Sequence, residues 1–308
     1  QAVPMTRLLL GLATASLALA ACTSPSGTPS AGSQAADGSG RPTIVAAFYP
    51  LEYAARAVGG DAFEVIGLTP PGGEPHDLEL SAAQVAEIAG ADLVLYVKGY
   101  QPAIDEAVAQ QAADHSLDVS AGLTLLPRAP ADGDQGATDP HVWLNPLNMA
   151  AIGTAITGRL SETTPDSTTI IAANNASLGD EMASLHEEFT AGLASCRSTI
   201  MVVSHEAFAY LGAAYGFTQV GISGLSPDAE PSPARMRDVA DLVAREGVTT
   251  IYYETLVDPK VAKTLADETG ATSAVLDPLE GLVAGSSNSY PTIMSKNLAT
   301  LRAGQGCA

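Results

Sequence analysis

The chain has 308 residues, of which 46% are hydrophobic, and it carries a formal net charge of −20 at pH 7. This length suffices for two domains of ordinary size, each with a core of its own. The acidic excess argues against nucleic acid or an anionic lipid surface as a partner, because both attract clustered lysine and arginine, and it weakly favours capture of a cation.

Residues 1–21 predict a secretory signal peptide, because a basic residue precedes an apolar run from Leu8 to Ala21. The run is shorter than the ~20 apolar residues that a helix needs to cross a bilayer. The residues before Cys22 resemble the lipobox of bacterial lipoproteins, so we expect cleavage there and lipidation of Cys22; an ordinary signal with an incidental cysteine is the alternative. Residues 22–43, rich in Ser, Gly and Pro, predict a flexible tether. We therefore expect an extracytoplasmic protein that touches the membrane only through its lipid anchor.

From residue 44 onward, runs of β-branched and aromatic residues that are typical of strands alternate with helical patterns. The first predicted strands are Thr43–Phe48, Phe63–Leu68, Asp92–Val97 and Leu123–Leu126. The predicted helices between them are Tyr53–Val58, Ser81–Ile88 and Pro102–Gln111. Strands that alternate with helices indicate a parallel sheet, so residues 44–160 predict an N-terminal α/β lobe.

Two consecutive helical patterns, Asn145–Leu160 and Pro165–Leu193, then interrupt the alternation, and the second is long and amphipathic. We expect residues 161–194 to form a rigid linking helix. A second alternation follows, with strands Thr199–Ser204, Thr218–Ile222, Thr249–Glu254 and Thr272–Leu276 and helices Ala207–Ala214, Ser232–Glu246 and Pro259–Thr269. Residues 195–308 thus predict a C-terminal α/β lobe, and the predicted fold is a pair of lobes, each with a four-stranded parallel sheet flanked by helices.

Apart from Cys22, the chain has two cysteines, Cys196 and Cys307. An even pair in an oxidising compartment predicts a disulfide, which would fix the C-terminus to the start of the second lobe. Two free thiols are the alternative.

Ligands of open parallel sheets bind beyond the carboxyl ends of the strands. Three of the five histidines, His76, His141 and His205, lie beyond predicted strand ends, and Asp277 follows the last predicted strand. Three neutral imidazoles and one carboxylate suit a borderline-soft divalent ion in a tetrahedral site, with Zn²⁺ the first candidate. The sequence therefore predicts a metal ion held between the two lobes.

At these residues the chain resembles the cluster A-I (cluster 9) solute-binding proteins of zinc and manganese ABC transporters. The segments that carry the resemblance are Gly73-Glu74-Pro75-His76-Asp77-Leu78-Glu79-Leu80, Asp139-Pro140-His141-Val142-Trp143-Leu144-Asn145-Pro146, Val203-Ser204-His205-Glu206-Ala207-Phe208-Ala209-Tyr210-Leu211, Glu230-Pro231-Ser232-Pro233 and Leu276-Asp277-Pro278-Leu279. The resemblance implies two four-stranded α/β lobes joined by a long helix, with the metal at their interface. It also implies a monomer that delivers one Zn²⁺ per chain to an ABC permease, with His76, His141, His205 and Asp277 as the ligands. Manganese-type members tend to have glutamate at the third ligand position, so His205 favours zinc.

Many zinc members carry a histidine-rich acidic loop between the first two ligands, whereas residues 128–139 of this chain are short, acidic and free of histidine. This difference argues against a zinc-gathering role for the loop. Glu74, Glu206 and Glu280 adjoin the ligand loops, and we expect them to orient imidazole N–H groups as outer partners of the metal; solvated loop carboxylates are the alternative.

Three other functions compete with this interpretation. The first two are a manganese-binding member of the same family and a surface adhesin or interaction lipoprotein. The third is an exported zinc hydrolase, in which three histidines and an open coordination position would activate a water molecule. The sequence has no His-Glu-x-x-His helix and no Gly-x-Ser-x-Gly elbow, and Asp277 would fill the open position. We therefore expect a binding protein and not an enzyme.

Overall fold

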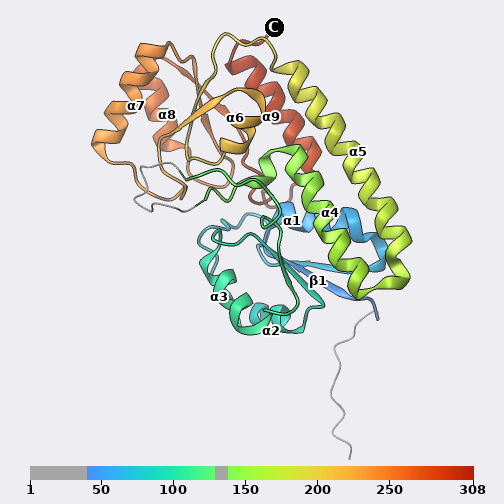
Figure 1. Cartoon of the computed structure of the whole chain (residues 1–308). Helices are drawn as coiled ribbons and strands as arrows, with labels where there is room; N and C mark the ends of the chain where they lie inside the picture. Colours follow the sequence, from blue (N-terminus) through green and yellow to red (C-terminus); the bar gives the residue numbers. More distant parts are fainter. Residues whose placement is uncertain (1–39, 129–137) are drawn as a thin grey trace, which may run out of the picture. The chain divides into compact units, whose positions relative to one another are not determined.

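The computed structural model describes residues 40–128 and 138–308 (Figure 1). The predicted signal peptide, Cys22, nearly all of the tether and most of the acidic loop 128–139 lie outside these residues. Among the helices of the described part, none combines the length and the apolar character that a membrane span requires.

The first sheet contains four parallel strands in the order β2-β1-β3-β4. These strands are β1 (Thr43–Ala46), β2 (Glu64–Gly67), β3 (Leu93–Tyr96) and β4 (Ser116–Asp118). The helices between them are α1 (Tyr49–Gly59), α2 (Ala82–Gly90) and α3 (Pro102–Gln111). Strands β1 and β3 are almost fully buried apolar runs, as expected for central strands of a parallel sheet. Helix α2 begins with a capping box in which the Ser81 and Gln84 side chains bond each other's backbone N–H.

The prediction for the fourth strand was wrong, because Leu123–Leu126 forms no strand and β4 lies upstream. Residues Leu123, Leu125 and Leu126 pack against the core from a loop, where the Leu126 N–H donates to the Tyr210 hydroxyl at 3.0 Å. The leucines of this apolar run are thus partly buried against the core, although the run does not pair with a strand of the sheet. Strand β4 has only three residues at the sheet edge, which is too short for an alternating pattern to appear in the sequence.

The second sheet repeats the topology of the first, with four parallel strands in the order β6-β5-β7-β8. Its strands are β5 (Ile200–Val203), β6 (Thr218–Gly221), β7 (Thr250–Tyr253) and β8 (Thr272–Val275). Its helices are α6 (Ala209–Tyr215), α7 (Pro233–Glu246), α8 (Lys260–Thr269) and α9 (Tyr290–Gly304). The prediction of two four-stranded parallel sheets is confirmed, whereas the limits 44–160 and 195–308 for the lobes stay predictions.

Helix α9 had no counterpart among the predicted elements, although its sequence carries a signal. Its buried residues include Tyr290, Ile293, Met294 and Leu301, which recur at helical spacing, and proline occupies its first turn. The preceding polar segment, which is rich in Gly and Ser, hides this period in the sequence.

Two α-helices connect the sheets, α4 (Pro146–Thr163) and α5 (Thr168–Gly192), and α5 has 25 residues. A short 3₁₀ helix precedes each of them: η3 (Val142–Leu144) comes before α4, and η4 (Pro165–Ser167) comes before α5. Helices α4 and α5 run side by side in Figure 1, and α5 also contacts α1 of the first half and α9 of the second. A Cβ on Gly153 of α4 would lie 2.6 Å from a Leu178 methyl on α5, so the missing side chain permits this close approach. The predicted long helix between the sheets is thus confirmed.

The larger of two hydrophobic clusters in the described residues contains side chains of both halves, and Trp143 lies within it, whereas the smaller cluster lies in the second half. The Trp143 side chain is fully buried, its ring contacts Phe48 of the first half, and its indole N–H donates to the Pro278 carbonyl of the second half at 2.8 Å. The Tyr290 hydroxyl in turn donates to the Trp143 carbonyl at 2.6 Å. These contacts fix the carboxyl ends of the two sheets relative to each other.

Cys196 and Cys307 form a disulfide, which confirms the predicted pair. It closes a sequence separation of 111 residues and lies beside the hydrogen bond from the Arg197 N–H to the Gln305 carbonyl.

Reduction of this disulfide is expected to lower the free energy of unfolding by about 4–5 kcal/mol, because a crosslink across a loop of this length restricts the unfolded chain strongly. Urea denaturation of oxidised and reduced protein measures the difference. The double variant Cys196→Ser/Cys307→Ser should match the reduced protein and show no response to reductant. Equal urea midpoints for oxidised and reduced protein would contradict the prediction.

Candidate metal centre

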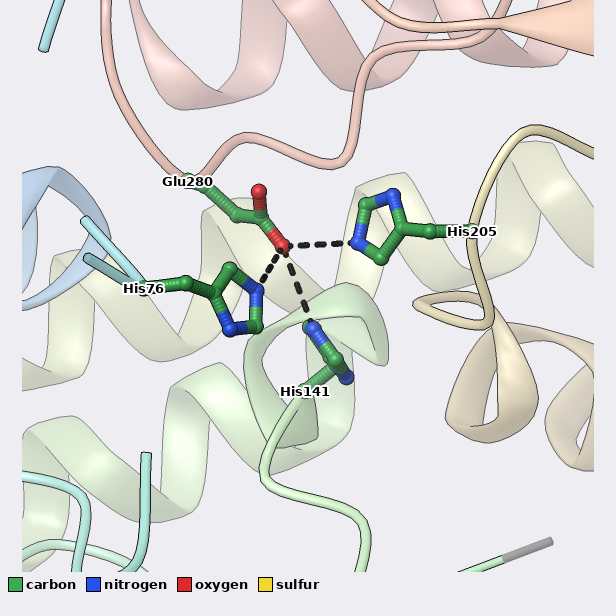
Figure 2. Close-up of side chains that lie close together, drawn as sticks. All are labelled: His76, His141, His205 and Glu280. Carbon is green, nitrogen blue, oxygen red and sulfur yellow. Dashed lines mark hydrogen bonds and ion pairs between the residues drawn. The ribbon is translucent and has the colours of Figure 1, made fainter. Parts of the chain in front are cut away.

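Four side chains, two from each half, meet at the carboxyl ends of the sheets (Figure 2). His76 lies in the loop between β2 and α2, and His141 directly precedes η3. His205 follows β5, and Glu280 lies in the loop after β8. The loop of His76 is joined to that of Glu280 by a hydrogen bond from the Gly72 N–H to the Leu282 carbonyl at 2.6 Å.

The three imidazoles converge on one oxygen atom. Oε1 of Glu280 lies 3.1 Å from Nε2 of His76, 3.1 Å from Nε2 of His141 and 3.0 Å from Nε2 of His205. The ring centroids are 5.5–5.8 Å apart. His141, His205 and Glu280 are fully buried, whereas the His76 side chain is 11% exposed. His76 also lines a cavity of 290 Å³. Among the four side chains of the centre, His76 is therefore the one that borders an open space.

Two further carboxylates orient the imidazoles from behind. Nδ1 of His141 lies 2.9 Å from Asp139 Oδ1, and Nδ1 of His205 lies 2.8 Å from Glu254 Oε1. A carboxylate at Nδ1 favours the N–H there and leaves the Nε2 lone pair directed into the centre. The centre thus has the arrangement of a histidine metal site, with outer partners that fix the imidazole tautomer.

The electrostatics of the centre favour a positive charge. Burial alone would lower the pKa of His205, but the carboxylates of Glu280 and Glu254 raise it well above its ordinary value. Burial would raise the pKa of Glu280, but the surrounding imidazoles, His205 foremost, hold it well below its ordinary value. Burial also lowers the pKa of His76, which keeps that imidazole neutral and able to ligate a metal.

Nε2 of His141 is a buried atom of the centre that makes no hydrogen bond within the described residues, although it lies 3.1 Å from Glu280 Oε1. A metal ion would satisfy this lone pair. Zinc bonds of ~2.0–2.1 Å in a tetrahedron place neighbouring ligand atoms about 3.3 Å apart, close to the distances between Glu280 Oε1 and the three nitrogens. The three distances from the Glu280 oxygen to the imidazole nitrogens are therefore close to those of a zinc site, and all four atoms lie within 4.8 Å of one another.

Asp277, predicted as the fourth ligand, is not in this group, and Glu280 occupies the place expected for it. The Asp277 carboxylate serves its own loop: Oδ1 accepts from the Leu279 N–H at 2.8 Å and Oδ2 accepts from the Thr255 hydroxyl at 3.1 Å. Leu279 is fully buried and has a φ of 56°, in the left-handed region that non-glycine residues rarely adopt. This turn carries the chain on to Glu280, so Asp277 stabilises the loop that positions Glu280.

The other predicted outer partners lie elsewhere. The Glu74 carboxylate accepts from the backbone N–H of His76 at 2.9 Å and does not bond an imidazole, and burial together with Glu280 raises the pKa of Glu74 to about 8. Glu206 lies 3.6 Å from Arg235. The carboxylates that do contact imidazoles, Asp139 and Glu254, were not predicted in that role; Glu254 directly follows β7, and the strand-end rule would have indicated it.

Comparison with known proteins gives a consistent result over both halves. Residues 44–304 match the family model of ZnuA, described as zinc-uptake complex component A, periplasmic. The zinc-binding lipoprotein AdcA of Streptococcus pneumoniae is 33% identical over 279 residues, which covers 85% of this chain and 56% of AdcA. The chain thus spans just over half the length of AdcA. The high-affinity zinc uptake system protein ZnuA of Bacillus subtilis is 31% identical, with 84% of this chain and 86% of that protein covered.

Solved structures show the same similarity. The Zn(II)-bound ZnuA-like domain of S. pneumoniae AdcA superposes with a TM-score of 0.75 at 33% identity, covering 86% of this chain and 99% of that one. The laminin-binding protein Lmb of Streptococcus agalactiae, titled a bifunctional protein with adhesin and metal transporting activity, gives 0.76 at 30% identity, with coverage of 86% and 99%.

Replacement of Asp277 separates the role of a loop-positioning residue from that of a ligand. Asp277→Ala removes the acceptor of the Leu279 N–H and is expected to weaken zinc binding about 10- to 100-fold, the usual effect of losing an outer partner. Asp277→Asn retains an acceptor oxygen and is expected to stay within a few-fold of the wild type. Competition with a chelating dye measures both variants. Equal, severe losses in Asp277→Ala and Asp277→Asn would show that the carboxylate itself binds the metal.

Proposed function

The chain belongs to the ZnuA family of zinc-uptake complex components, and from this premise we propose that it binds one Zn²⁺ through His76, His141, His205 and Glu280. The observation that carries the proposal is the convergence of three imidazole nitrogens on the buried Glu280 oxygen, at 3.0–3.1 Å. The fourth ligand is then Glu280 and not Asp277.

The donor set favours zinc over manganese. Neutral imidazoles suit zinc, whereas Mn²⁺ prefers more oxygen ligands, and this centre offers three nitrogens. The outer carboxylates Asp139 and Glu254 make the ligating nitrogens of His141 and His205 more basic, which strengthens their bonds to the ion.

We further propose that the protein delivers the ion to the permease of an ABC importer, outside the cytoplasm, as a monomer anchored by lipid at Cys22. The shared core and the Trp143 contacts restrict movement of one half against the other. Release would then proceed by local movement on the side of His76, the partly exposed ligand.

Adhesion is a second candidate function, favoured by the similarity to Lmb over 86% of the chain. Binding of the purified protein to immobilised laminin tests it, with and without bound zinc. No saturable binding in either state would remove this candidate and leave the metal proposal untouched.

Single replacement of each proposed ligand is expected to weaken zinc binding by more than about 100-fold, beyond the effect of losing an outer partner, because a direct bond to the ion is lost. The variants are His76→Ala, His141→Ala, His205→Ala and Glu280→Gln. Calorimetry and elemental analysis should give one zinc per wild-type chain.

His115→Ala is the matched control, because His115 bonds Asp114 and the Ile88 carbonyl and does not belong to the metal centre. It should bind zinc as the wild type does. A wild-type protein that takes up no zinc, or a Glu280→Gln variant of unchanged affinity, would contradict the proposed site.

A further inference from the structure

The hydroxyl of Tyr210, a residue of α6 in the second half, joins two backbone segments of the first half. It accepts from the Leu126 N–H at 3.0 Å and donates to the Asp139 carbonyl at 2.8 Å. The Asp139 N–H in turn donates to the Leu126 carbonyl at 2.9 Å. The three hydrogen bonds form a closed ring in which each donor has its own acceptor.

This ring is protected from water. Tyr210 and Asp139 are each 3% exposed, so water has little opportunity to replace the bond between them. Burial raises the pKa of Tyr210 to about 12, which keeps the hydroxyl protonated at neutral pH and able to donate. A buried backbone carbonyl that loses its donor is costly to the fold, so the ring is expected to persist.

The ring leads to the metal centre through the Asp139 side chain. Oδ1 of Asp139 accepts from the backbone N–H of His141 at 2.9 Å and lies 2.9 Å from Nδ1 of the same residue. Tyr210 follows His205 by five residues, at the start of the helix that comes after it. The segment that carries His205 is therefore joined to the residue that orients His141, by contacts that exist without an ion.

We propose that Tyr210 is a positioning residue for zinc binding: through Asp139, its hydroxyl holds the His141 imidazole at the spacing from His205 that the ion requires. Asp139 alone fixes the tautomer and the direction of the His141 ring. Tyr210 fixes Asp139 relative to the other half of the molecule. This inference rests on the proposed function, because it takes His141 and His205 as ligands.

Tyr210→Phe tests the proposal, because it removes the hydroxyl and keeps the packed ring. We expect zinc binding to weaken about 10-fold, at the lower end of the effect of losing an outer partner, since the hydroxyl acts through Asp139. Competition with a chelating dye measures this change. Co²⁺ serves as a spectroscopic probe of the same ligands, and its visible absorption spectrum should differ between Tyr210→Phe and the wild type.

A double-mutant cycle with Asp139→Ala separates positioning from a general loss of stability. Asp139→Ala breaks the connection to His141, so adding Tyr210→Phe to it should weaken zinc binding by less than about 2-fold further. If Tyr210 only stabilised the fold, the two losses of affinity would multiply. Urea denaturation of the zinc-free variants verifies that each of them is folded.

Tyr252→Phe is the matched control, because the Tyr252 hydroxyl is buried in the same half and makes no hydrogen bond within the described residues. It should bind zinc and give the Co²⁺ spectrum of the wild type. Unchanged zinc affinity in Tyr210→Phe, an unchanged Co²⁺ spectrum, or losses that multiply in the double variant would overturn the role of Tyr210. A wild-type chain that takes up no zinc would instead overturn the proposed function.

Discussion

A fully buried carboxylate requires positive charge nearby, and three imidazoles surround one oxygen of Glu280; among them, His205 has a pKa raised by Glu280 and Glu254. Hydrogen bonds satisfy this arrangement incompletely, since His141 Nε2 makes no hydrogen bond within the described residues. A divalent ion would bond all three nitrogens and the carboxylate together. The carboxylates behind His141 and His205 then serve to hold each imidazole in the tautomer that ligation needs.

The fold supplies these groups from two sheets of identical strand order whose carboxyl ends face a common centre. Since two side chains of the candidate centre come from each half, the halves must be held at a fixed spacing, and the core that contains residues of both halves performs this task. Trp143 contributes most directly: it follows His141 by two residues, packs against Phe48 and bonds the loop that leads to Glu280. Helix α5 adds to this by contacting helices of both halves.

The sequence sufficed to predict both parallel sheets, the long helix, the disulfide and a centre that contains His76, His141 and His205, because strand ends and loop histidines are local features. The identity of the carboxylate was beyond such reasoning. Asp277 directly follows the last predicted strand, but the left-handed turn at Leu279 carries the chain to Glu280 before it reaches the imidazoles. Leu123–Leu126 shows a related limit of prediction from sequence, because an apolar run indicates that its side chains are buried but does not show that its backbone pairs with a strand.

Anomalous diffraction at the zinc absorption edge, on crystals of the zinc-loaded protein, tests the central claim most directly. The account predicts a single anomalous peak about 2.0–2.2 Å from Nε2 of His76, His141 and His205 and from a carboxylate oxygen of Glu280. A peak bonded to Asp277, or one bonded to fewer than the three imidazoles, would contradict it.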